Sequence, residues 1–425
     1  MSQSSSTSSP ITSRIVNRSP IFYGWIILLA GTIGMVMTSP GQTYVISVVL
    51  EPLLQELSLS RSWVSILYAF GTLLSGFALP YVGYLVDRFG PRSVVIATTI
   101  IAILSCFFMS IVQNAVMLTI AFILLRLFTH GSLTLVSQNV INQWWIRRRG
   151  MAMGLNGIVW GLLGFGAFPI IIRRLVDQYD WRWTYGIQGI MLLVIMLPVG
   201  ALLFRSRPEL FGLHPDGDLA LSGEKAENKL VEENWTRQEA MGTWAFWIPA
   251  LGVGVNGMMI TGLFFHMESI FTDNGLATSL AALVFAPIAL TNAVVNLGGG
   301  YLADRVPARF LLGGALLLLS AGIVMALYLT GPTMAMLYGV MLGTSIGMIV
   351  LVQNIIWANY FGREHLGAIT GVATTILMIG NGLGPVPLGF ARDLLGSYDL
   401  ALYLLALLPF ALGIGSLLVG KPEKA

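Results

Sequence analysis

The sequence predicts an all-α membrane protein with twelve transmembrane helices in two pseudo-symmetric six-helix halves. The chain of 425 residues is 56% hydrophobic and 10% charged, and its mean hydropathy is +0.79. An average soluble domain is about 25% charged, so a soluble core cannot hold this many apolar residues and a bilayer must solvate many of them. A ten-residue motif at 83–92 recurs at 300–309. Such an internal repeat in an apolar chain indicates two related halves.

The individual spans are predicted from the apolar runs, because crossing a bilayer takes roughly 20 helical residues. We expect spans at 22–50, 62–83, 93–112, 117–144, 151–174, 184–204, 244–272, 279–301, 310–330, 333–361, 366–390 and 399–419. Pro40-Gly41 predicts a bend in the first span. The long polar segment between the sixth and seventh spans predicts a linker between the halves.

The expected domain organisation follows from these runs. It comprises a disordered tail at 1–20, an N-terminal half at 21–204, a cytoplasmic linker at 205–243, a C-terminal half at 244–420 and a short tail at 421–425. Most of the 23 Lys and Arg residues fall in loops on the side of the N-terminus, which predicts that both termini are cytoplasmic. We therefore expect a multi-pass protein of the plasma membrane, the inner membrane in a bacterium. One chain completes the twelve-helix unit, so a monomer suffices.

Composition and motifs exclude several classes of function. The net charge of +3 comes without a dense basic stripe, so we expect no nucleic-acid partner. The four histidines and one cysteine are scattered without metal-ligand spacing, so we expect no metal, no cofactor and no enzyme activity. The chain has no phosphate-binding loop of the form Gly-x-x-x-x-Gly-Lys-Ser/Thr, so ATP is not the expected energy source.

The repeat extends beyond the first motif into later spans. The further matching pairs are Gln138-Asn139 with Gln353-Asn354, Gly164 with Gly380, Gly166 with Gly382, and Pro169 with Pro385. Small residues let helix backbones approach closely. We therefore expect spans five and eleven to pack tightly, each within its own half.

The segment 83–92 resembles the signature loop of the major facilitator superfamily, which reads roughly Gly-x-Leu-x-Asp-Arg-x-Gly-x-Arg/Lys. The matching residues are Gly83, Leu85, Asp87, Arg88, Gly90 and Arg92. The second copy, at 300–309, has Pro307 where the pattern has a glycine. The resemblance covers the whole chain. It implies the major facilitator fold and transport of a small molecule by alternating access.

Other motifs resemble the monocarboxylate and oxalate:formate antiporter branch of that superfamily. They are 23–25, 143–152, 208–217, 360–363 and 384–385. This resemblance implies a small organic anion as substrate, a monocarboxylate above all, carried with a proton. One departure is plain: members of the branch carry a carboxylate-binding cation in span eight or eleven, and here neither span contains a charge.

The signature loops are expected to form a conformational latch. Asp87 and Asp304 end spans at the cytoplasmic surface, where a carboxylate can cap a neighbouring helix and pair with the arginine that follows it. The superfamily resemblance implies that this latch stabilises the outward-open state. The predicted latch residues are Gly83, Asp87, Arg88, Arg92, Asp304 and Arg305. The alternative interpretation is a turn with solvated charges.

Arg126 is the leading candidate for substrate binding. It lies near the middle of span four, where an ionised residue is costly and usually faces a cavity or a partner. His130 follows at i+4 on the same face. The positive charge of Arg126 disfavours a second positive charge on His130. Arg126 is expected to hold an anionic substrate, or alternatively to act as a structural clamp against backbone carbonyls or Glu51.

His266 and Glu268 are the candidates for proton coupling. Both lie near the outer end of span seven. In a low-dielectric environment a carboxyl group retains its proton more readily, which suits a proton carrier. The alternatives are that Glu268 extends to the outer membrane interface and that His266 is a hydrogen-bonded structural residue.

Uncharged polar residues within the spans complete the predicted substrate passage. Polar side chains inside lipid need internal partners or water. The predicted set is Tyr44, Asn139, Asn256, Asn292, Gln353 and Asn381. For any one of them the alternative is a hydrogen bond between helices.

The leading functional hypothesis is a secondary active transporter that moves a small organic anion with a proton. Its partners would be that small molecule, the proton and the lipid bilayer. The alternative is export of amphipathic or neutral organic compounds by proton antiport, which the largely uncharged second half and its aromatic residues favour. A third hypothesis is a sensor that binds ligand without transport. Nothing in the sequence supports it, because we find no attached soluble signalling domain. Measured flux and the charge of the substrate would discriminate the three.

Overall fold

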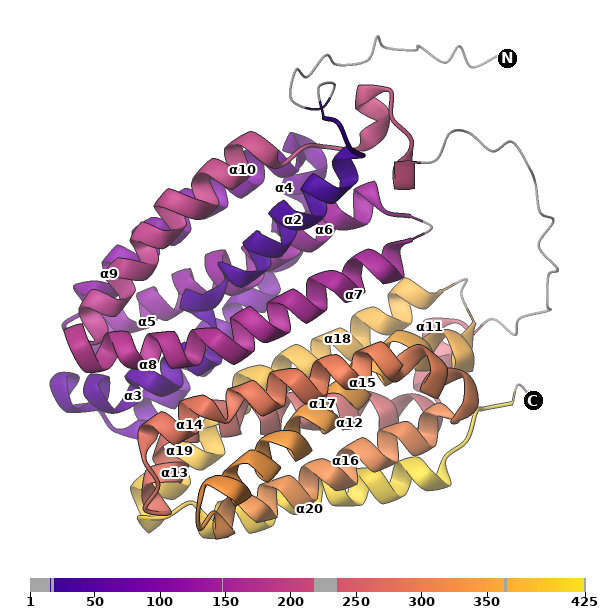
Figure 1. The fold of residues 1–425 in the computed structure, drawn as a ribbon. Coiled ribbons are helices and arrows are strands. Elements are labelled where there is room, and N and C mark those ends of the chain that lie inside the picture. The colour runs from indigo at the N-terminus through magenta and orange to yellow at the C-terminus, as the bar shows by residue number, and fades with distance from the viewer. Residues whose placement is uncertain (1–15, 17–18, 147, 218–234, 363–364, 424–425) are drawn as a thin grey trace.

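The computed structural model describes residue 16 and residues 19–146, 148–217, 235–362 and 365–423. Side chains at a few positions within these ranges, including 299–304, lie outside the described part of the molecule. Regular structure in the described ranges is helical throughout. In Figure 1 the helices lie in two groups, one coloured indigo to magenta and the other orange to yellow.

The first group contains the helices up to residue 203. They are α2 (Tyr23–Val36), η1 (Ser39–Gly41), α3 (Thr43–Leu57), α4 (Arg61–Ser110), α5 (Ala115–Leu124), η2 (Leu125–Leu133), α6 (Thr134–Trp144), α7 (Arg149–Trp160), η3 (Gly161–Ala167), α8 (Phe168–Tyr179), α9 (Trp181–Met191), η4 (Leu192–Met196) and α10 (Leu197–Leu203). The elements η2, η3 and η4 are π-helical and continue the α-helices before them.

Two short helical turns and the second group follow. They are η5 (Pro208–Phe211), η6 (Pro215–Gly217), α11 (Arg237–Met241), α12 (Trp244–Phe265), α13 (Met267–Asp273), α14 (Thr278–Leu283), α15 (Phe285–Arg305), α16 (Ala308–Met325), η7 (Ala326–Tyr328), α17 (Pro332–Phe361), α18 (Leu366–Leu383), α19 (Pro385–Leu395) and α20 (Asp399–Leu418).

Eleven helical segments in the described ranges are long and apolar enough to cross a membrane. One of them is long enough for two crossings. That segment is α4, whose 50 residues would extend about 75 Å if straight, more than twice the hydrocarbon core of a bilayer. Gly90, with φ of 79°, interrupts it. The predicted twelve spans are therefore confirmed.

The two arms of α4 run in opposite directions. Arg61, at the start of α4, forms an ion pair with Glu51 of α3. At the other terminus, the carbonyl of Ser110 accepts a hydrogen bond from Arg182, which also pairs with Glu56 of α3. Both ends of α4 thus lie beside α3, and the chain reverses at Gly90.

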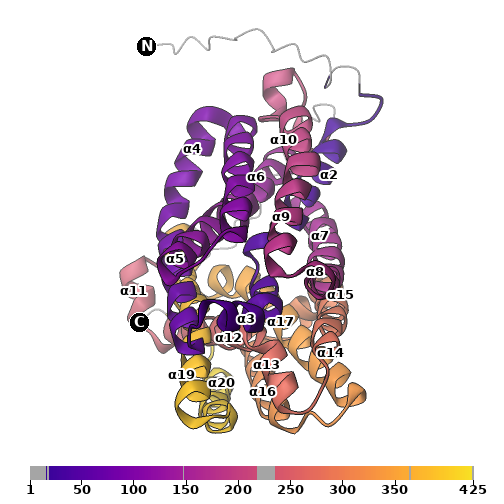
Figure 2. The same cartoon turned by 90° about the vertical axis from the view of Figure 1, so that its left-hand side faces the viewer.

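The two ends of the bundle are distinguished by the elements that lie at each. The terminal end is where α2 begins and α20 ends, and the far end is where α3, α8, α13 and α19 lie (Figure 1). Figure 2 is viewed toward the far end and shows α3 and α13 close together there, in agreement with their backbone contacts.

Several spans bend or break at the far-end side of their middle. The bend predicted at Pro40-Gly41 is confirmed, because α2 ends at Val36, a short 3₁₀ turn follows, and α3 begins at Thr43. Span seven breaks at His266, between α12 and α13. Span eleven breaks between Gly384 and Pro385. At two of these breaks a backbone carbonyl contacts a buried polar side chain: the carbonyl of Gly41 accepts from Arg126, and that of Pro385 lies 3.0 Å from Nε2 of His266.

The glycines predicted to pack spans five and eleven within their own halves divide between two kinds of contact. In α18, a methyl group added at Gly380 would lie 2.2 Å from the carbonyl oxygen of Gly254, so α18 packs tightly on α12 within its half. The neighbours of Gly166 are Ala286 and Ala289 of α15, and those of Gly382 are Leu73 and Ala69 of α4. The prediction is therefore wrong for Gly166 and Gly382, which lie at the interface between the halves.

Candidate transport cavity

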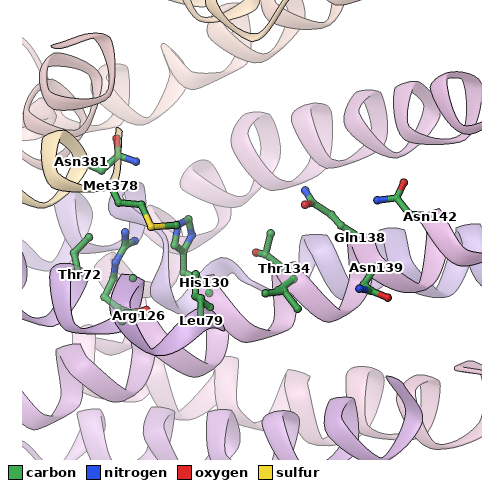
Figure 3. Close-up of a pocket in the computed structure, with 14 residues that line it drawn as sticks. Thr72, Leu79, Arg126, His130, Thr134, Gln138, Asn139, Asn142, Met378 and Asn381 are labelled. Atoms are coloured by element: carbon green, nitrogen blue, oxygen red, sulfur yellow. The ribbon is translucent and has the colours of Figure 1, made fainter. Parts of the chain in front are cut away.

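A cavity of about 410 Å³ lies between the two groups of helices (Figure 3). Its lining comes from α4, η2 and α6 of the first group and from α18 of the second. The lining residues are Thr72, Ser75, Gly76, Leu79, Arg126, His130, Gly131, Thr134, Leu135, Gln138, Asn139, Asn142, Met378 and Asn381. The cavity volume matches a small organic molecule.

Arg126 is a buried cation in this lining. It sits in the π-helical segment η2 and is 5% exposed. One terminal nitrogen donates a hydrogen bond of 2.9 Å to the carbonyl of Gly41, and the guanidinium lies over the ring of Tyr68. Nε is buried without a hydrogen-bond partner, and no ion pair joins Arg126 to a carboxylate of the described chain. The predicted contact with a carbonyl is present, whereas Glu51 pairs with Arg61 instead.

His130 lies beside Arg126 in the same wall of the cavity. Figure 3 shows the two side chains close together, with Arg126 extending toward Met378 and Asn381. The Nδ1 atom of His130 is buried without a hydrogen-bond partner. A guanidinium and an imidazole thus lie side by side in the cavity lining, and each has one buried nitrogen without a hydrogen-bond partner among the described residues.

Amide side chains continue the polar wall along α6. Gln138, Asn139 and Asn142 follow Thr134 in Figure 3, on the side away from Arg126. Asn139 accepts a hydrogen bond of 2.7 Å from Gln143. The helix ends at the terminal end, because Trp145 donates to the carbonyl of Gly24 near the start of α2. The polar wall thus runs from the middle of the molecule toward the terminal end.

The second half contributes uncharged groups to the described lining. Asn381 accepts a hydrogen bond of 3.3 Å from Thr261 of α12. Gly257 allows this approach, because a methyl group there would lie 2.4 Å from the Asn381 Oδ1. Met378 lies one turn earlier on α18. The absence of a cation in span eleven, evident in the sequence, leaves Arg126 as the cationic side chain of this lining.

Four residues of the predicted passage lie outside this lining. Tyr44 packs against Phe165 and Phe285, with ring centroids 5.5 and 6.0 Å away. Asn256 donates to Ser345, and Asn292 accepts from Asn296, so both make hydrogen bonds to other residues of the second half. The fourth residue, Gln353, is half-buried in α17.

His266 is buried at the break between α12 and α13. Its Nε2 lies 3.0 Å from the carbonyl oxygen of Pro385, and its Nδ1 lies 3.2 Å from the hydroxyl of Tyr398. Burial raises the pKa of Tyr398 to about 12, so this hydroxyl keeps its proton at neutral pH. Both ring nitrogens of His266 are therefore engaged in joining α12 to the start of α19 and α20.

Glu268 is buried between the halves at the far end. It is 3% exposed, and its Oε2 pairs with Arg173 of α8 at 3.0 Å. Its backbone N–H faces the hydroxyl of Ser47 in α3 at 3.4 Å. The alternative in which Glu268 extends to the membrane interface is wrong, because the first half covers the side chain.

Other polar contacts join the halves at the same end. Arg61 of α4 donates to the hydroxyl of Ser269 at 2.5 Å, and this hydroxyl donates to Glu51 at 2.8 Å. The backbone N–H of Ser62 donates to Asp393 of α19 at 2.7 Å. Polar contacts between the halves are thus concentrated at the far end, while the cavity wall extends toward the terminal end.

Comparison with known protein families agrees with this architecture. A sequence model of the Major Facilitator Superfamily matches residues 40–385. The chain belongs to the major facilitator superfamily. It is accordingly a multi-pass membrane protein and a secondary transporter of small molecules, not an enzyme.

Relatives of this superfamily transporter carry several functional names. Monocarboxylate transporter 13 of Bos taurus is 26% identical over 350 residues, which cover 79% of this chain and 75% of the bovine protein. The uncharacterized MFS-type transporter YhjX of Escherichia coli K12 is 26% identical over 377 residues, 85% of this chain and 86% of YhjX. The agnestins efflux protein AgnL12 of Paecilomyces divaricatus is 23% identical over 315 residues, 71% of this chain and 65% of that protein.

The predicted latch of the superfamily transporter lies at the terminal end. Asp87 and Arg88 are exposed, and Arg88 donates to the hydroxyl of Tyr84 in its own helix. Arg92 donates to the carbonyl of Ala201 in α10. A methyl group added at Gly83 would meet no atom within 4 Å. In the second copy Arg305 is exposed, and the side chain of Asp304 lies outside the described residues.

Sequence reasoning missed the part of the lining that α4 supplies. Thr72, Ser75, Gly76 and Leu79 follow the i, i+3, i+4, i+7 spacing of one helix face. Two small hydroxyl residues on one face of an apolar span are a detectable signal of a polar passage in a superfamily transporter. This signal is easily overlooked in the sequence, because a single serine or threonine in a helix can form a hydrogen bond to the backbone of that helix.

Proposed function

We propose that this transporter moves a small organic anion, a monocarboxylate in the simplest case, together with a proton. The observation that carries the proposal is Arg126, a buried guanidinium in the cavity lining that has no carboxylate partner among the described residues. A buried cation needs a counter-charge to offset its loss of hydration. A substrate carboxylate supplies that charge through charge-assisted hydrogen bonds.

The remaining lining indicates how much charge the substrate carries. Its other polar groups are hydroxyls and amides, together with His130. One guanidinium balances one carboxylate, whereas a second carboxylate would meet neutral groups that cannot offset its desolvation. A monoanion with hydroxyl, keto or amide groups along its length therefore fits better than a dianion. The name of the bovine relative, a monocarboxylate transporter, supports the same class.

Proton coupling rests on the two carriers predicted from sequence. His266 has both ring nitrogens engaged by Pro385 and Tyr398. Glu268 has one oxygen bound to Arg173 and one buried oxygen, Oε1, without a partner. A carboxyl group with a free oxygen can take up a proton without breaking a hydrogen-bond network. Glu268 is therefore the better-supported carrier.

The membrane and its orientation are part of the proposal. The excess of Lys and Arg in loops at the terminal end supports cytoplasmic termini. In that orientation the far end faces outward, and the described conformation is closed to the outside. We propose the plasma membrane, a bacterial inner membrane, as its site, and a monomer as the working unit, because one chain supplies all twelve spans.

The test is external alkalinisation in vesicles that contain the purified transporter. Small monocarboxylates, dicarboxylates and neutral analogues would be added one at a time while external pH is recorded. We expect a signal for at least one monocarboxylate. Arg126→Ala should weaken substrate binding by roughly tenfold to a hundredfold, because a hydrogen bond to a charged group contributes about 1.5–3 kcal/mol.

Two matched variants sharpen this test. Arg126→Lys retains the charge but loses the forked donor geometry, so partial activity is expected. Arg237→Ala removes an exposed guanidinium of α11, away from the cavity, and should leave transport unchanged. Full activity of folded Arg126→Ala would refute the proposed role of Arg126. Silence of the wild type across all acids would refute anion symport.

A second candidate function is export of amphipathic or neutral compounds by proton antiport. The described lining from the second half, Met378 and Asn381, is uncharged and favours such cargo. The name of the fungal efflux relative supports it. In the same vesicles, proton-gradient-driven movement of neutral or cationic amphipaths, with no response to acids, would favour this function over symport.

A further inference from the structure

A second cavity lies in the second half, at the terminal end of the molecule. Its volume is about 370 Å³, within the range of about 300–1,000 Å³ that is typical of ligand pockets. The start of α16, the end of α17 and the segment after α20 line it. It shares no lining residue with the transport cavity, so it is a separate site.

The charged side chains in the described lining of this second cavity are both cations. Arg309 is half-buried and Lys421 is exposed. Neither forms an ion pair with a described carboxylate. The guanidinium of Arg309 lies over the ring of Phe310, with 4.7 Å between Cζ and the ring centroid, and this contact leaves its charge uncompensated. Two such cations beside one cavity favour an anionic ligand.

The equivalent arginine of the first half has a different role. Arg92 ends the first copy of the repeated motif, as Arg309 ends the second. The Nε atom of Arg92 donates a hydrogen bond of 2.8 Å to the carbonyl of Ala201, near the end of α10. The guanidinium of Arg309 has no hydrogen-bond partner among the described residues, and a methyl group added at Gly420 would lie 3.4 Å from its Nη1. The same position of the repeat is thus a structural contact in one half and an unpaired cation beside a cavity in the other.

Neutral donors complete the lining around these cations. Tyr360 is 7% exposed, and its hydroxyl has no hydrogen-bond partner among the described residues. Buried tyrosine hydroxyls usually have such a partner, so a bound acceptor is expected here. Helix α16 begins at Ala308, and Pro307 before it provides no side-chain cap. The first N–H groups of a helix have no partner within it, and its N-terminus favours negative charge.

Apolar surface lies next to the second cavity. Phe310 and Leu418 are 44% and 78% exposed, and both belong to membrane spans, where such side chains contact lipid. In the proposed orientation this corner of the molecule lies at the cytoplasmic surface, where anionic phospholipids are concentrated. Basic pockets between spans on that side of a membrane are suited to phosphate-bearing headgroups.

We propose that the second cavity is a binding site for a phosphate group. Arg309 and Lys421 supply the counter-charge, and the hydroxyl of Tyr360 and the N-terminus of α16 donate hydrogen bonds. A phospholipid headgroup and a soluble phosphate ester share this chemistry, and the exposed apolar surface beside the cavity favours the lipid. A bound phosphate would join α16, α17 and the segment after α20, and would stabilise the second half. The site does not depend on the transported substrate.

The experiment measures lipid binding to the purified, delipidated protein by native mass spectrometry. The probes are phosphatidylglycerol, which is anionic, and phosphatidylcholine, in which a choline cation balances the phosphate. We expect phosphatidylglycerol to bind at least about tenfold more tightly, because each basic side chain near an anionic headgroup contributes roughly a fivefold gain in affinity. Inorganic phosphate and glycerol 3-phosphate test the soluble source, since a bound ligand raises the melting temperature.

Four variants locate the bound lipid. Arg309→Ala should weaken phosphatidylglycerol binding about tenfold or more, and Lys421→Ala about fivefold. Gly420→Leu fills the cavity without removing a charge, so it should weaken binding as well. Arg237→Ala is the control, because it removes an exposed guanidinium of α11, outside the lining, and it should bind lipid as the wild type does.

Each outcome bears on the phosphate site. Equal affinity of the wild type for the two lipids, with no response to the soluble phosphates, would overturn the proposal, and this arm needs no variant to fold. Equal losses in Arg237→Ala and Arg309→Ala would indicate attraction to net charge alone and would also overturn it. Unchanged binding by folded Gly420→Leu would exclude the cavity. Stabilisation by the soluble phosphates, without a preference between the lipids, would support the site and make a soluble ester its ligand.

Discussion

The guanidinium of Arg126 lies over the ring of Tyr68, with 5.1 Å between Cζ and the ring centroid. Tyr68 in turn shares a hydrogen bond of 2.7 Å with Thr43 at the start of α3. An aromatic face stabilises a buried cation without neutralising its charge. The ring therefore holds Arg126 in place and leaves its charge available to an anion.

The ring of Tyr68 is expected to affect substrate binding more than its hydroxyl does. Tyr68→Phe keeps the face under Arg126 and should change the substrate KM by less than about threefold. Tyr68→Leu removes it and should raise KM by roughly three- to thirtyfold, because a desolvated cation–π contact contributes about 0.5–2 kcal/mol. Initial uptake rates over a substrate range check this, and equal effects of the two variants would contradict it.

Asn381 lines the same cavity as Arg126, so a substitution at this position can test the charge of the substrate. Asn381→Asp places a carboxylate in the same cavity and supplies the counter-charge that the substrate otherwise brings. We expect anion transport to fall at least about tenfold. Thr261→Val, which removes only the hydroxyl that donates to Asn381, is the control and should have a small effect. Unimpaired anion uptake by Asn381→Asp would place the anion elsewhere.

Because α12 and α18 pack closely, the effect of a Gly→Ala substitution on stability should differ strongly between positions of span eleven. A methyl group at Gly384 would lie 2.3 Å from the carbonyl oxygen of Met258, so Gly384→Ala should destabilise the protein by about 1–3 kcal/mol or more. Gly371 lies in the same span with no atom within 4 Å of an added methyl group. Gly371→Ala should leave thermal stability in detergent unchanged or slightly raised. Equal melting temperatures for the two variants would contradict the packing.

His266 is expected to stabilise structure and to leave coupling intact. His266→Gln loses the geometry that joins Pro385 to Tyr398, so we expect a lower melting temperature. The number of protons moved per substrate should stay as in wild type, because the pair between Arg173 and Glu268 is retained. A change in that ratio, measured from paired substrate and pH recordings, would instead make His266 a proton carrier.

The fold was predictable because its determinants are local. Each span is an apolar run, the bend at Pro40-Gly41 is a backbone property, and Arg126 stands out as a charge inside an apolar segment. Arg173 was not predictable as a partner of Glu268, because sequence placed it near a loop where an arginine is ordinary. Its role depends on which helices of the two halves meet. The same is true of Tyr44, whose aromatic neighbours lie far along the chain.

The reversal at Gly90 has a consequence for the geometry of the two arms of α4. Gly90 is the one residue of α4 that leaves the helical conformation, so the two membrane crossings share a single-residue hinge with no loop between them. A positive φ of 79° is accessible to glycine at little cost, whereas a residue with a side chain is strained there. The angle between the two crossings is therefore set by the backbone of this one glycine.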